Sequence, residues 1–448
     1  MAIETIVVLM LENRSFDHFF GYLQGPGYDV DGLTQTEVNY LDPVHQTGRV
    51  RVSDDAPYVP DVDPSPGHEF ANVAVQLHGP SGSTGLASNV GFVCDYASVA
   101  GAAKAGAVMR CFSPKRLPVV TTLAREFAIC KAWFSSLPGP TWPNRFFAHC
   151  ATSGGYVDGA LTREYTMRTL YQNLSAAGVN WRVYYHDMPQ SLALLHQRQY
   201  FAAKYELYGQ AFVRDCEEGR LPQYSFIEPR YFNEGSSRAN DQHPIHGVVN
   251  GELLVAEVYE ALRASPQWDN AMLIVTWDEN GGFYDHVPPV AATPPDDQTQ
   301  QFDFASYGVR VPAIVVSPLI ASRTIDPDVH DHASIPATAK EAFALPEYLT
   351  KRDADAKSVT ALCSLKQPRR DAPSRLPRPS ADAMVASAAA SFESQSLNDL
   401  QVELLALARE LGGVGSPRNT MIAAPPVSQA AAAAEIRAHL DRFRASLT

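Results

Sequence analysis

Two apolar runs in this chain each end in residues whose oxygen atoms bind cations. The first run covers residues 5–11 and the second covers residues 271–277. The residues that follow the two runs are Glu12, Asn13, Asp278 and Glu279. In an open α/β sheet, sites form at the carboxyl ends of the strands, and carboxylate and amide oxygens suit a divalent cation. The pattern therefore predicts a sheet in which the tips of two distant strands share one cation site.

Apolar runs typical of strands alternate with helical patterns along most of the chain. We expect strands over residues 4–11, 127–134, 181–185, 223–227, 271–277 and 311–317. We expect helices over about 116–126, 143–151, 166–177, 248–263 and 333–344. Strands separated by helices imply a mainly parallel sheet that is covered on both faces. The fold class is therefore α/β.

Two stretches interrupt this alternation. Residues 22–100 are rich in Gly, Pro, Asp and Ser, and residues 283–309 are rich in Pro, Asp and Gln. Neither stretch shows the periodicity of a helix or a strand. We expect residues 22–100 to form long ordered loops over the site, and residues 283–309 to be a similar excursion before the next strand.

The composition changes again after about residue 350. Residues 366–382 hold several Pro and Arg residues and are typical of a disordered linker. Alanine-rich helical patterns follow over about 395–411 and 428–446. We therefore expect a catalytic domain over residues 1–352, and a linker with a C-terminal helical extension packed on the core over residues 353–448.

Charge and hydropathy exclude some classes of function. The chain of 448 residues is 45% hydrophobic, which is enough for a full globular core. Its net charge of −13 argues against nucleic acid as a partner. An anionic substrate remains compatible with this charge, because a bound metal inverts the local sign.

The sequence also bears on the compartment. No apolar run approaches the roughly 20 residues that a membrane-spanning helix needs, and residues 1–4 lead directly into the first strand without the pattern of a signal peptide. As written, the chain reads as cytoplasmic, although an exported protein trimmed of its leader would look the same. Six cysteines without a CxxC pair favour free thiols, and one disulfide stays open.

The segment Gly139-Pro140-Thr141-Trp142-Pro143-Asn144 predicts a helix that begins near Pro143. Thr141 would then lie at the N-terminus of this helix, where free N–H groups and a positive dipole favour a phosphate. A hydroxyl at this place can attack phosphorus if a cation lowers its pKa. Asn144, one turn on, can donate to a phosphate oxygen. Taken alone, Thr141 is better explained as a simple helix cap.

Histidines supply the remaining chemistry. His68 follows Asp63-Pro64-Ser65-Pro66-Gly67, His243 lies in Asn240-Asp241-Gln242-His243-Pro244, and His186 follows an expected strand. Imidazoles orient a phosphate, donate to it or protonate a leaving group. Each of these histidines, considered singly, is better explained by packing or surface exposure.

Four motifs in this order resemble a known family. They are MLENRSFDHFFG (10–21), GPTWPNRFF (139–147), NDQHP (240–244) and WDENGGFYDHV (277–287). Together they resemble the phosphoesterase family that joins bacterial phospholipases C, plant non-specific phospholipases C and a group of bacterial acid phosphatases. The resemblance spans residues 4 to about 350.

The resemblance implies an alkaline-phosphatase-like α/β fold and a set of site residues. By this resemblance, the metal ligands are Glu12, Asn13, Asp278 and Glu279, together with Thr141. Thr141 is then the nucleophile, and Asn144 binds phosphate. Histidines of the family map to His68 and His243, and more loosely to His186. The phospholipases resemble this chain in using Thr where the acid phosphatases use Ser.

These observations favour a metal-dependent phosphoric-ester hydrolase of the phospholipase C type that forms a phospho-threonine intermediate. A histidine such as His243 would protonate the departing oxygen. An acid phosphatase acting on small phosphomonoesters is the alternative, and a protein that binds phosphate or lipid headgroups without catalysis is a more distant one. No G-x-S-x-G elbow supports a serine lipase.

The ligand set predicts one divalent metal ion. Oxygen ligands favour Ca²⁺, Mg²⁺ or Mn²⁺, and Zn²⁺ stays open. The expected partner is a phospholipid or small phosphoester, with at most transient contact to a membrane surface.

Overall fold

The structure is a computed structural model of the chain. It describes residues 3–59, 61–80, 87–160, 163–299, 301–389, 396–413 and 428–448.

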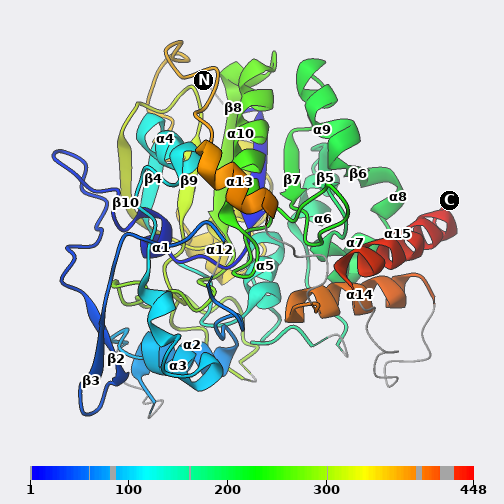
Figure 1. The fold of residues 1–448 in the computed structure, drawn as a ribbon. Helices are drawn as coiled ribbons and strands as arrows, with labels where there is room; N and C mark the ends of the chain where they lie inside the picture. Colours follow the sequence, from blue (N-terminus) through cyan, green and yellow to red (C-terminus); the bar gives the residue numbers. More distant parts are fainter. Residues whose placement is uncertain are drawn as a thin grey trace.

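One sheet of eight strands forms the centre of the molecule (Figure 1). Its order is β10-β4-β9-β8-β1-β7-β5-β6. In chain order, the strands are β1 Thr5–Leu11, β4 Ala128–Trp133, β5 Trp181–Tyr185, β6 Tyr205–Leu207, β7 Tyr224–Glu228, β8 Ala271–Trp277, β9 Ala313–Val316 and β10 Thr324–His330. Only β9 runs antiparallel to its neighbours; the other pairs within this described sheet are parallel. The predicted mainly parallel α/β sheet is confirmed.

The two apolar runs pair directly in the centre of this sheet. β1 and β8 are parallel over their whole length, from Thr5 opposite Ala271 to Leu11 opposite Trp277. Every residue of both strands is buried. Their equal length and register bring the residues that follow, at positions 12 and 278, out of the sheet side by side.

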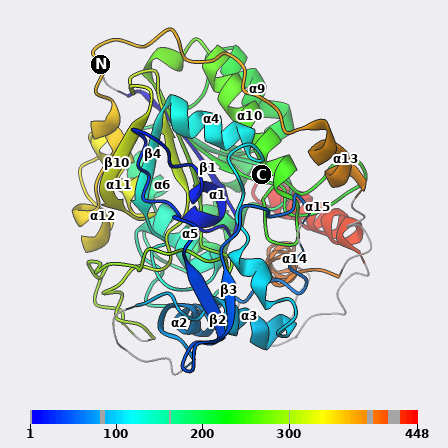
Figure 2. The same ribbon diagram turned by 60° about the vertical axis from the view of Figure 1, so that its left-hand side comes forward.

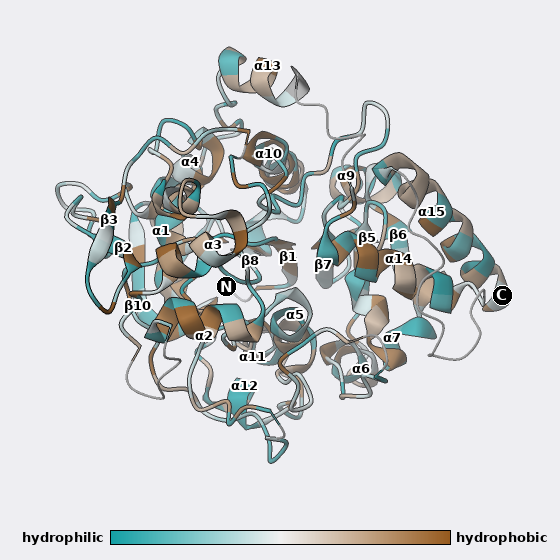
Figure 3. Ribbon diagram, turned by 60° about the horizontal axis from the view of Figure 1, so that its bottom comes forward, coloured by the Kyte–Doolittle hydropathy of each residue, from teal (hydrophilic) through white to brown (hydrophobic). Residues whose placement is uncertain are grey.

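Helices cover both faces of the sheet, and Figure 3 shows the three layers from the end of the strands. One layer contains α4 Pro118–Glu126, α9 Tyr208–Glu217 and α10 Val248–Ala264. The other contains α5 Thr141–Cys150, α6 Leu170–Ala176 and α11 Ser334–Ala342. Helix α5 begins two residues before the expected position, at Thr141 itself. Three shorter helices are α7 Leu195–Arg198, α8 Phe201–Lys204 and α12 Lys351–Asp355.

Residues 22–100 contain regular structure that their composition did not predict. After α1 Phe16–Phe20 come the hairpin strands β2 Val38–Asp42 and β3 Thr47–Arg51, and the helices α2 Phe70–His78 and α3 Phe92–Ala100. The hairpin and the helices α2 and α3 lie at one end of the molecule, below the sheet in Figure 1 and at the bottom of Figure 2. Their apolar residues, among them Val73, Leu77 and Tyr96, form a second hydrophobic cluster. The expectation of loops alone was therefore wrong for this stretch.

The expectation of a disordered linker over residues 366–382 was also wrong. Arg370 pairs with Asp269 at 2.7 Å, and Arg378 pairs with Glu260 of α10 at 2.7 Å. Leu376 is buried. This segment therefore follows the surface of the sheet domain as far as α13 Ala381–Ala389.

Two further helices follow, α14 Asp399–Leu411 and α15 Gln429–Ser446. Leu404 and Leu407 of α14 and Ile436 and Leu440 of α15 are buried in the same hydrophobic core as β1 and β8. The C-terminal helices thus share the main core.

The six cysteines are all free thiols, as expected. Among the described residues, no helix is long and apolar enough to cross a membrane.

Candidate active site

The tip of β1 meets the start of α5. Oγ1 of Thr141 donates a hydrogen bond of 3.2 Å to Oε2 of Glu12, and both side chains are buried. Thr141 is the first residue of a ten-residue helix. Its hydroxyl therefore lies at the end of the helix that carries the free N–H groups and the positive end of the dipole. A hydroxyl, a carboxylate and a helix N-terminus therefore lie close together.

The residues that follow β8 contact the residues that follow β1. The N–H of Asn13 donates to Oδ1 of Asp278 at 2.8 Å, and the N–H of Glu279 donates to the same oxygen at 2.7 Å. The N–H of Gly281 holds Oε2 of Glu279 at 2.7 Å. Asn13 has a φ of 57°, a left-handed conformation that Asn tolerates better than most residues. The turn after β1 thus connects to the turn after β8.

Arg145 was not assigned a role from the sequence, and it lies among the acids. Its Nη2 donates to Oε1 of Glu12 at 2.7 Å, and its Nε lies 3.4 Å from Oδ2 of Asp278. Its Nη1 lies 3.4 Å from Oε2 of Glu228 at the end of β7. Arg145 is four residues after Thr141 on α5, a spacing that places two side chains on one face of a helix. That spacing was the available signal.

Two other residues contact the acids of the site, and no pattern in the sequence indicated either of them. Gln190 donates from Nε2 to Oε1 of Glu12 at 2.7 Å. His332 accepts from Nε1 of Trp133 at its Nδ1, so its Nε2 donates to the backbone oxygen of Asp278 at 2.6 Å. Both contacts fix the positions of acidic residues at the strand ends.

Burial and neighbouring carboxyls disfavour the charged forms of two acids in this site. Burial raises the pKa of Glu12 well above its ordinary value; Arg145 opposes this rise and Asp278 adds to it. Burial raises the pKa of Glu279 to about 8, while His68 acts in the opposite direction. An added cation would relieve the same cost.

Buried oxygen atoms without hydrogen-bond partners test whether a metal ion fits. Among the described residues, Oδ1 of Asn13 and Oε1 of Glu279 have no such partner, and Oδ2 of Asp278 has none apart from the ion pair with Arg145. An unpaired buried polar atom is costly. Carboxylate, amide and hydroxyl oxygens are the donor set of a hard divalent cation. The donor chemistry of these residues therefore fits the predicted ion.

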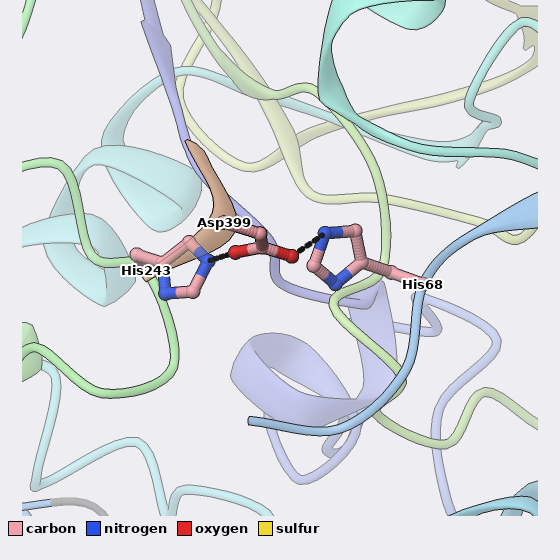
Figure 4. Close-up of side chains that lie close together, drawn as sticks. All are labelled: His68, His243 and Asp399. Atoms are coloured by element: carbon pink, nitrogen blue, oxygen red, sulfur yellow. Dashed lines mark ion pairs between the residues drawn. The ribbon is translucent and has the colours of Figure 1, made fainter. Parts of the chain in front are cut away.

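A second cluster lies beside Thr141 and contains a residue that the sequence did not indicate. Asp399, the first residue of α14, lies between His68 and His243 (Figure 4). Its Oδ2 is 3.5 Å from Nε2 of His68, and its Oδ1 is 3.8 Å from Nε2 of His243. The two histidines are buried. The predicted histidines thus come together around a carboxylate of the C-terminal extension.

The two histidines differ in their electrostatics. Burial acts to lower the pKa of His68, but Glu279, Asp399 and Glu69 together raise it to about 9. Burial lowers the pKa of His243 well below its ordinary value, and Asp399 only partly offsets this. At neutral pH and without an ion, His68 is therefore the protonated member of the pair.

A small pocket gives access to Thr141. Its lining includes His68, Glu69, Trp142, Asp399 and Glu403 together with Thr141. Both α5 and α14 therefore contribute walls to the opening above the hydroxyl. Burial raises the pKa of Glu403 to about 8, and Asp399 and Glu69 add to this rise.

Asn144 lies in the site region but its amide is occupied. Its Oδ1 accepts from the N–H of Leu137 at 3.2 Å, and its Nδ2 donates to the carbonyls of Gly139 at 2.8 Å and Pro140 at 3.1 Å. The side chain shapes the loop that presents Thr141. Its predicted contact with phosphate stays a prediction.

His186 lies apart from the other predicted histidines. Its Nδ1 donates to the carbonyl of Glu228 at 2.9 Å, and its ring stacks on Tyr208 with centroids 4.4 Å apart. Burial lowers the pKa of His186 to about 3. Its described contacts do not reach Thr141, so no role is assigned to it below.

Sequence comparison identifies relatives along most of the chain. The model of the Phosphoesterase family matches residues 3–346. Non-specific phospholipase C3 of Arabidopsis thaliana is 38% identical over 92% of this chain and 83% of its own length. Non-specific phospholipase C6 of the same plant is 40% identical over 92% of this chain and 81% of its own length. Phospholipase C B of Mycobacterium tuberculosis (strain ATCC 25618 / H37Rv) is 27% identical over 85% of this chain and 81% of its own length.

Solved structures show a weaker likeness. A phosphonate monoester hydrolase of Agrobacterium radiobacter aligns with a TM-score of 0.38 and 9% identity, over 81% of this chain and 77% of that chain. This score is too low to carry an argument, and the relationship to known proteins rests on the sequence matches.

Proposed function

Because this chain belongs to the Phosphoesterase family and is a phosphoric-ester hydrolase, we propose that it is a phospholipase C with Thr141 as its nucleophile. The supporting observation is the hydrogen bond of 3.2 Å from Oγ1 of Thr141 to Oε2 of Glu12 at the start of α5. The relatives at about 40% identity that carry the name non-specific phospholipase C support the substrate class.

The metal dependence is part of the proposal. Five side chains would hold one divalent ion: Glu12, Asn13, Thr141, Asp278 and Glu279. When bound, such an ion lowers the pKa of a hydroxyl and neutralises charge on phosphate oxygens. The unpartnered oxygens of Asn13 and Glu279 support this assignment.

The residues of the chain supply the other elements of the reaction. Oγ1 of Thr141 attacks phosphorus in line, and its proton passes to Oε2 of Glu12, which already accepts its hydrogen bond. The new O–P bond replaces the bond from phosphorus to diacylglycerol. The N-terminus of α5 and the histidines stabilise charge on the phosphate oxygens.

Proton delivery to the leaving oxygen falls to His68 rather than to His243. His68 lines the pocket beside Thr141 and faces the carboxylate of Asp399, which favours the protonated imidazole, whereas burial lowers the pKa of His243 well below its ordinary value. Water then hydrolyses the phospho-threonine and releases the phosphorylated headgroup, which regenerates the hydroxyl of Thr141.

The pocket favours a phospholipid over a small phosphomonoester. Glu69 and Glu403 line it beside Thr141, and although burial raises the pKa of both carboxyls, an ammonium group placed beside this acidic wall would favour their ionised forms. Such a wall attracts the ammonium group of a choline or ethanolamine headgroup and repels the dianion of a monoester. This observation supports phospholipase C over the acid phosphatase alternative.

A substrate panel with two variants tests the proposal. Wild type should release phosphorylcholine from phosphatidylcholine faster than it hydrolyses a generic phosphomonoester. Thr141→Ala should abolish both reactions, while Thr141→Ser should retain part of the activity. Rapid acid quenching should place one phosphoryl group on the peptide that contains Thr141. Near-normal turnover by Thr141→Ala would rule out the covalent mechanism, and a preference for monoesters would favour the phosphatase.

A further inference from the structure

Arg14 is a buried arginine without an acidic partner. Among the described residues four arginines are buried, and the other three are Arg145, Arg310 and Arg352. Each of these three forms an ion pair with a carboxylate, at 2.7, 3.0 and 3.0 Å respectively. Arg14 has an exposed fraction of 2% and forms no ion pair with any described residue. A buried charge without a counter-charge is costly, so a bound anion would stabilise this guanidinium.

The guanidinium of Arg14 also has donors that its protein contacts do not use. Its Nε donates to the carbonyl of Gln242 at 2.8 Å, and its Nη2 lies 3.4 Å from the carbonyls of His243 and His246. No described residue accepts a hydrogen bond from Nη1, which carries two N–H groups. Burial lowers the pKa of Arg14 to about 9 and Asp241 acts in the opposite direction, so the guanidinium stays charged at neutral pH.

Arg14 and His18 line a pocket that is separate from the pocket beside Thr141. The ring of His18 stacks on Phe283, another wall residue, with centroids 3.8 Å apart. Its Nδ1 is buried and has no hydrogen-bond partner among the described residues. Burial and the charge of Arg14 lower the pKa of His18 well below its ordinary value. The ring is therefore neutral at pH 7 and has one N–H to donate.

The other charged residues of this wall are paired with each other. Nη1 of Arg110 donates to Oδ2 of Asp61, and both residues line the pocket. Nε of Arg110 also donates to Oδ1 of Asp55 at 3.1 Å, but the side chain of Asp55 is 61% exposed and lies outside the lining. Exposed charges are screened by water and salt. The unscreened charge at this pocket is therefore that of the buried Arg14.

The size of the pocket selects the kind of anion. Its cavity volume is about 10 Å³, which is close to the room that one water-sized sphere needs. A phosphate or sulfate ion is larger than this space. We propose that the pocket is a halide site, in which the guanidinium of Arg14 and the imidazole of His18 hold one chloride ion. The aromatic and aliphatic walls disfavour strongly hydrated anions in the same place.

The halide site connects to the active site through Arg14. The nitrogen atoms that do not face the ion hold the carbonyls of Gln242 and His243, so a bound chloride ion fixes the loop that carries His243. Chloride should therefore raise turnover of phosphatidylcholine by about fivefold, the lower end of ordinary couplings between two sites. This second step rests on the proposed function, whereas the binding of chloride does not.

Chloride NMR tests the binding directly on the full chain. The line width of the chloride signal is measured at constant ionic strength, with gluconate as the replacement anion. Wild type should broaden the signal, and bromide should reverse the broadening where sulfate does not. Ala107→Leu, in the wall formed by the 3₁₀ helix η1 Ala105–Met109, fills the pocket and should abolish the broadening without removing Arg14 or His18. Arg375→Gln is the control, because Arg375 is 82% exposed and far from the pocket lining.

Two further variants locate the ion. His18→Phe keeps a ring against Phe283 but removes the N–H, and it should weaken chloride binding about tenfold, the equivalent of one charge-assisted hydrogen bond. Asp278→Asn should bind chloride like wild type, since it alters only the proposed metal site. Circular dichroism checks the fold of each variant.

The outcomes either support or overturn the halide site. An unchanged line width with wild type overturns it, and so does broadening that Ala107→Leu retains. Broadening that disappears in Asp278→Asn but not in Ala107→Leu would place the chloride at the proposed metal site and would also overturn it. Broadening that only the pocket variants remove supports the site, whether or not the chain hydrolyses phosphatidylcholine. Failure of the proposed function therefore leaves this test unaffected.

Discussion

Nη2 of Arg145 lies 2.7 Å from Oε1 of Glu12, so a guanidinium is buried within the acidic cluster at the strand tips. The same guanidinium faces Asp278 and Glu228, each at 3.4 Å. Burial alone would lower the pKa of Arg145, but Glu12, Tyr231 and Asp278 outweigh it and raise the pKa. The permanent positive charge allows the acids to be packed in the core before any ion binds.

Replacing Arg145 by Met should destabilise the fold strongly. The change would leave Glu12 and Asp278 buried without their counter-charge, and breaking a buried ion pair in this way costs about 3–5 kcal/mol. Urea unfolding followed by circular dichroism measures the free energy of unfolding. Arg378→Met is the matched control, because its pair with Glu260 is 43% exposed on the arginine side and should contribute at most about 1 kcal/mol. Equal losses in the two variants would contradict the role given to Arg145.

Removal of metal should lower the thermal stability. An ion that binds only the native state stabilises it by mass action, and its loss leaves the buried carboxylates of Asp278 and Glu279 without the charge of the ion. Chelator should therefore lower the melting temperature, and a divalent ion should restore it. Asp278→Asn should respond less than wild type, because its affinity for the ion is already reduced. A melting temperature that chelator leaves unchanged would argue against a resident ion.

Much of the fold followed from hydrophobic patterning. β1 and β8 are continuous apolar runs, as strands of a parallel sheet are when both of their faces are buried. The ends of such an apolar run predict the ends of the strand. Because both strands were expected to run in the same direction, Glu12 and Asp278 were expected at the same edge of the sheet. The N-terminus of α5 at Thr141 followed from the local chemistry of Pro and Thr.

Other features depend on contacts that no local pattern contains. β9 runs antiparallel between two strands, and this reversal is set by neighbours far away in sequence. The helices in residues 22–100 are short and bury their apolar side chains against one another, so composition alone suggested loops. Asp399 reaches His68 across more than 300 positions, and nothing near it in sequence distinguishes it from an ordinary acidic residue at a helix start.

Glu252 should make the stability depend on pH. This buried carboxyl accepts hydrogen bonds from the N–H groups of Val119 and Val120 at 2.8 and 3.0 Å, yet burial dominates and raises its pKa from 4.5 to about 8. Between these two values the native state holds a proton that the unfolded state has released. The free energy of unfolding should therefore fall as pH rises through this window, by at most about 1.4 kcal/mol per pH unit.

The variant Glu252→Gln isolates this contribution. The amide cannot ionise, so the variant should lose less stability than wild type between pH 5 and pH 8, and the two curves should run parallel above pH 8. Urea unfolding at several pH values measures the difference. Identical slopes for the two proteins would show that Glu252 does not titrate in this window.

Leu404→Ala should destabilise the entire protein and not only the C-terminal helices. Leu404 of α14 has an exposed fraction of 0% and belongs to the same hydrophobic core as β1 and β8. Truncating a buried Leu to Ala costs about 2–5 kcal/mol. Since the core is continuous, unfolding should remain one cooperative transition at a lower urea concentration. Val385→Ala on α13 is the control, because Val385 is 67% exposed and should have little effect. Two separate transitions, with the sheet retaining wild-type stability, would instead support a boundary near residue 352 between independently folding parts.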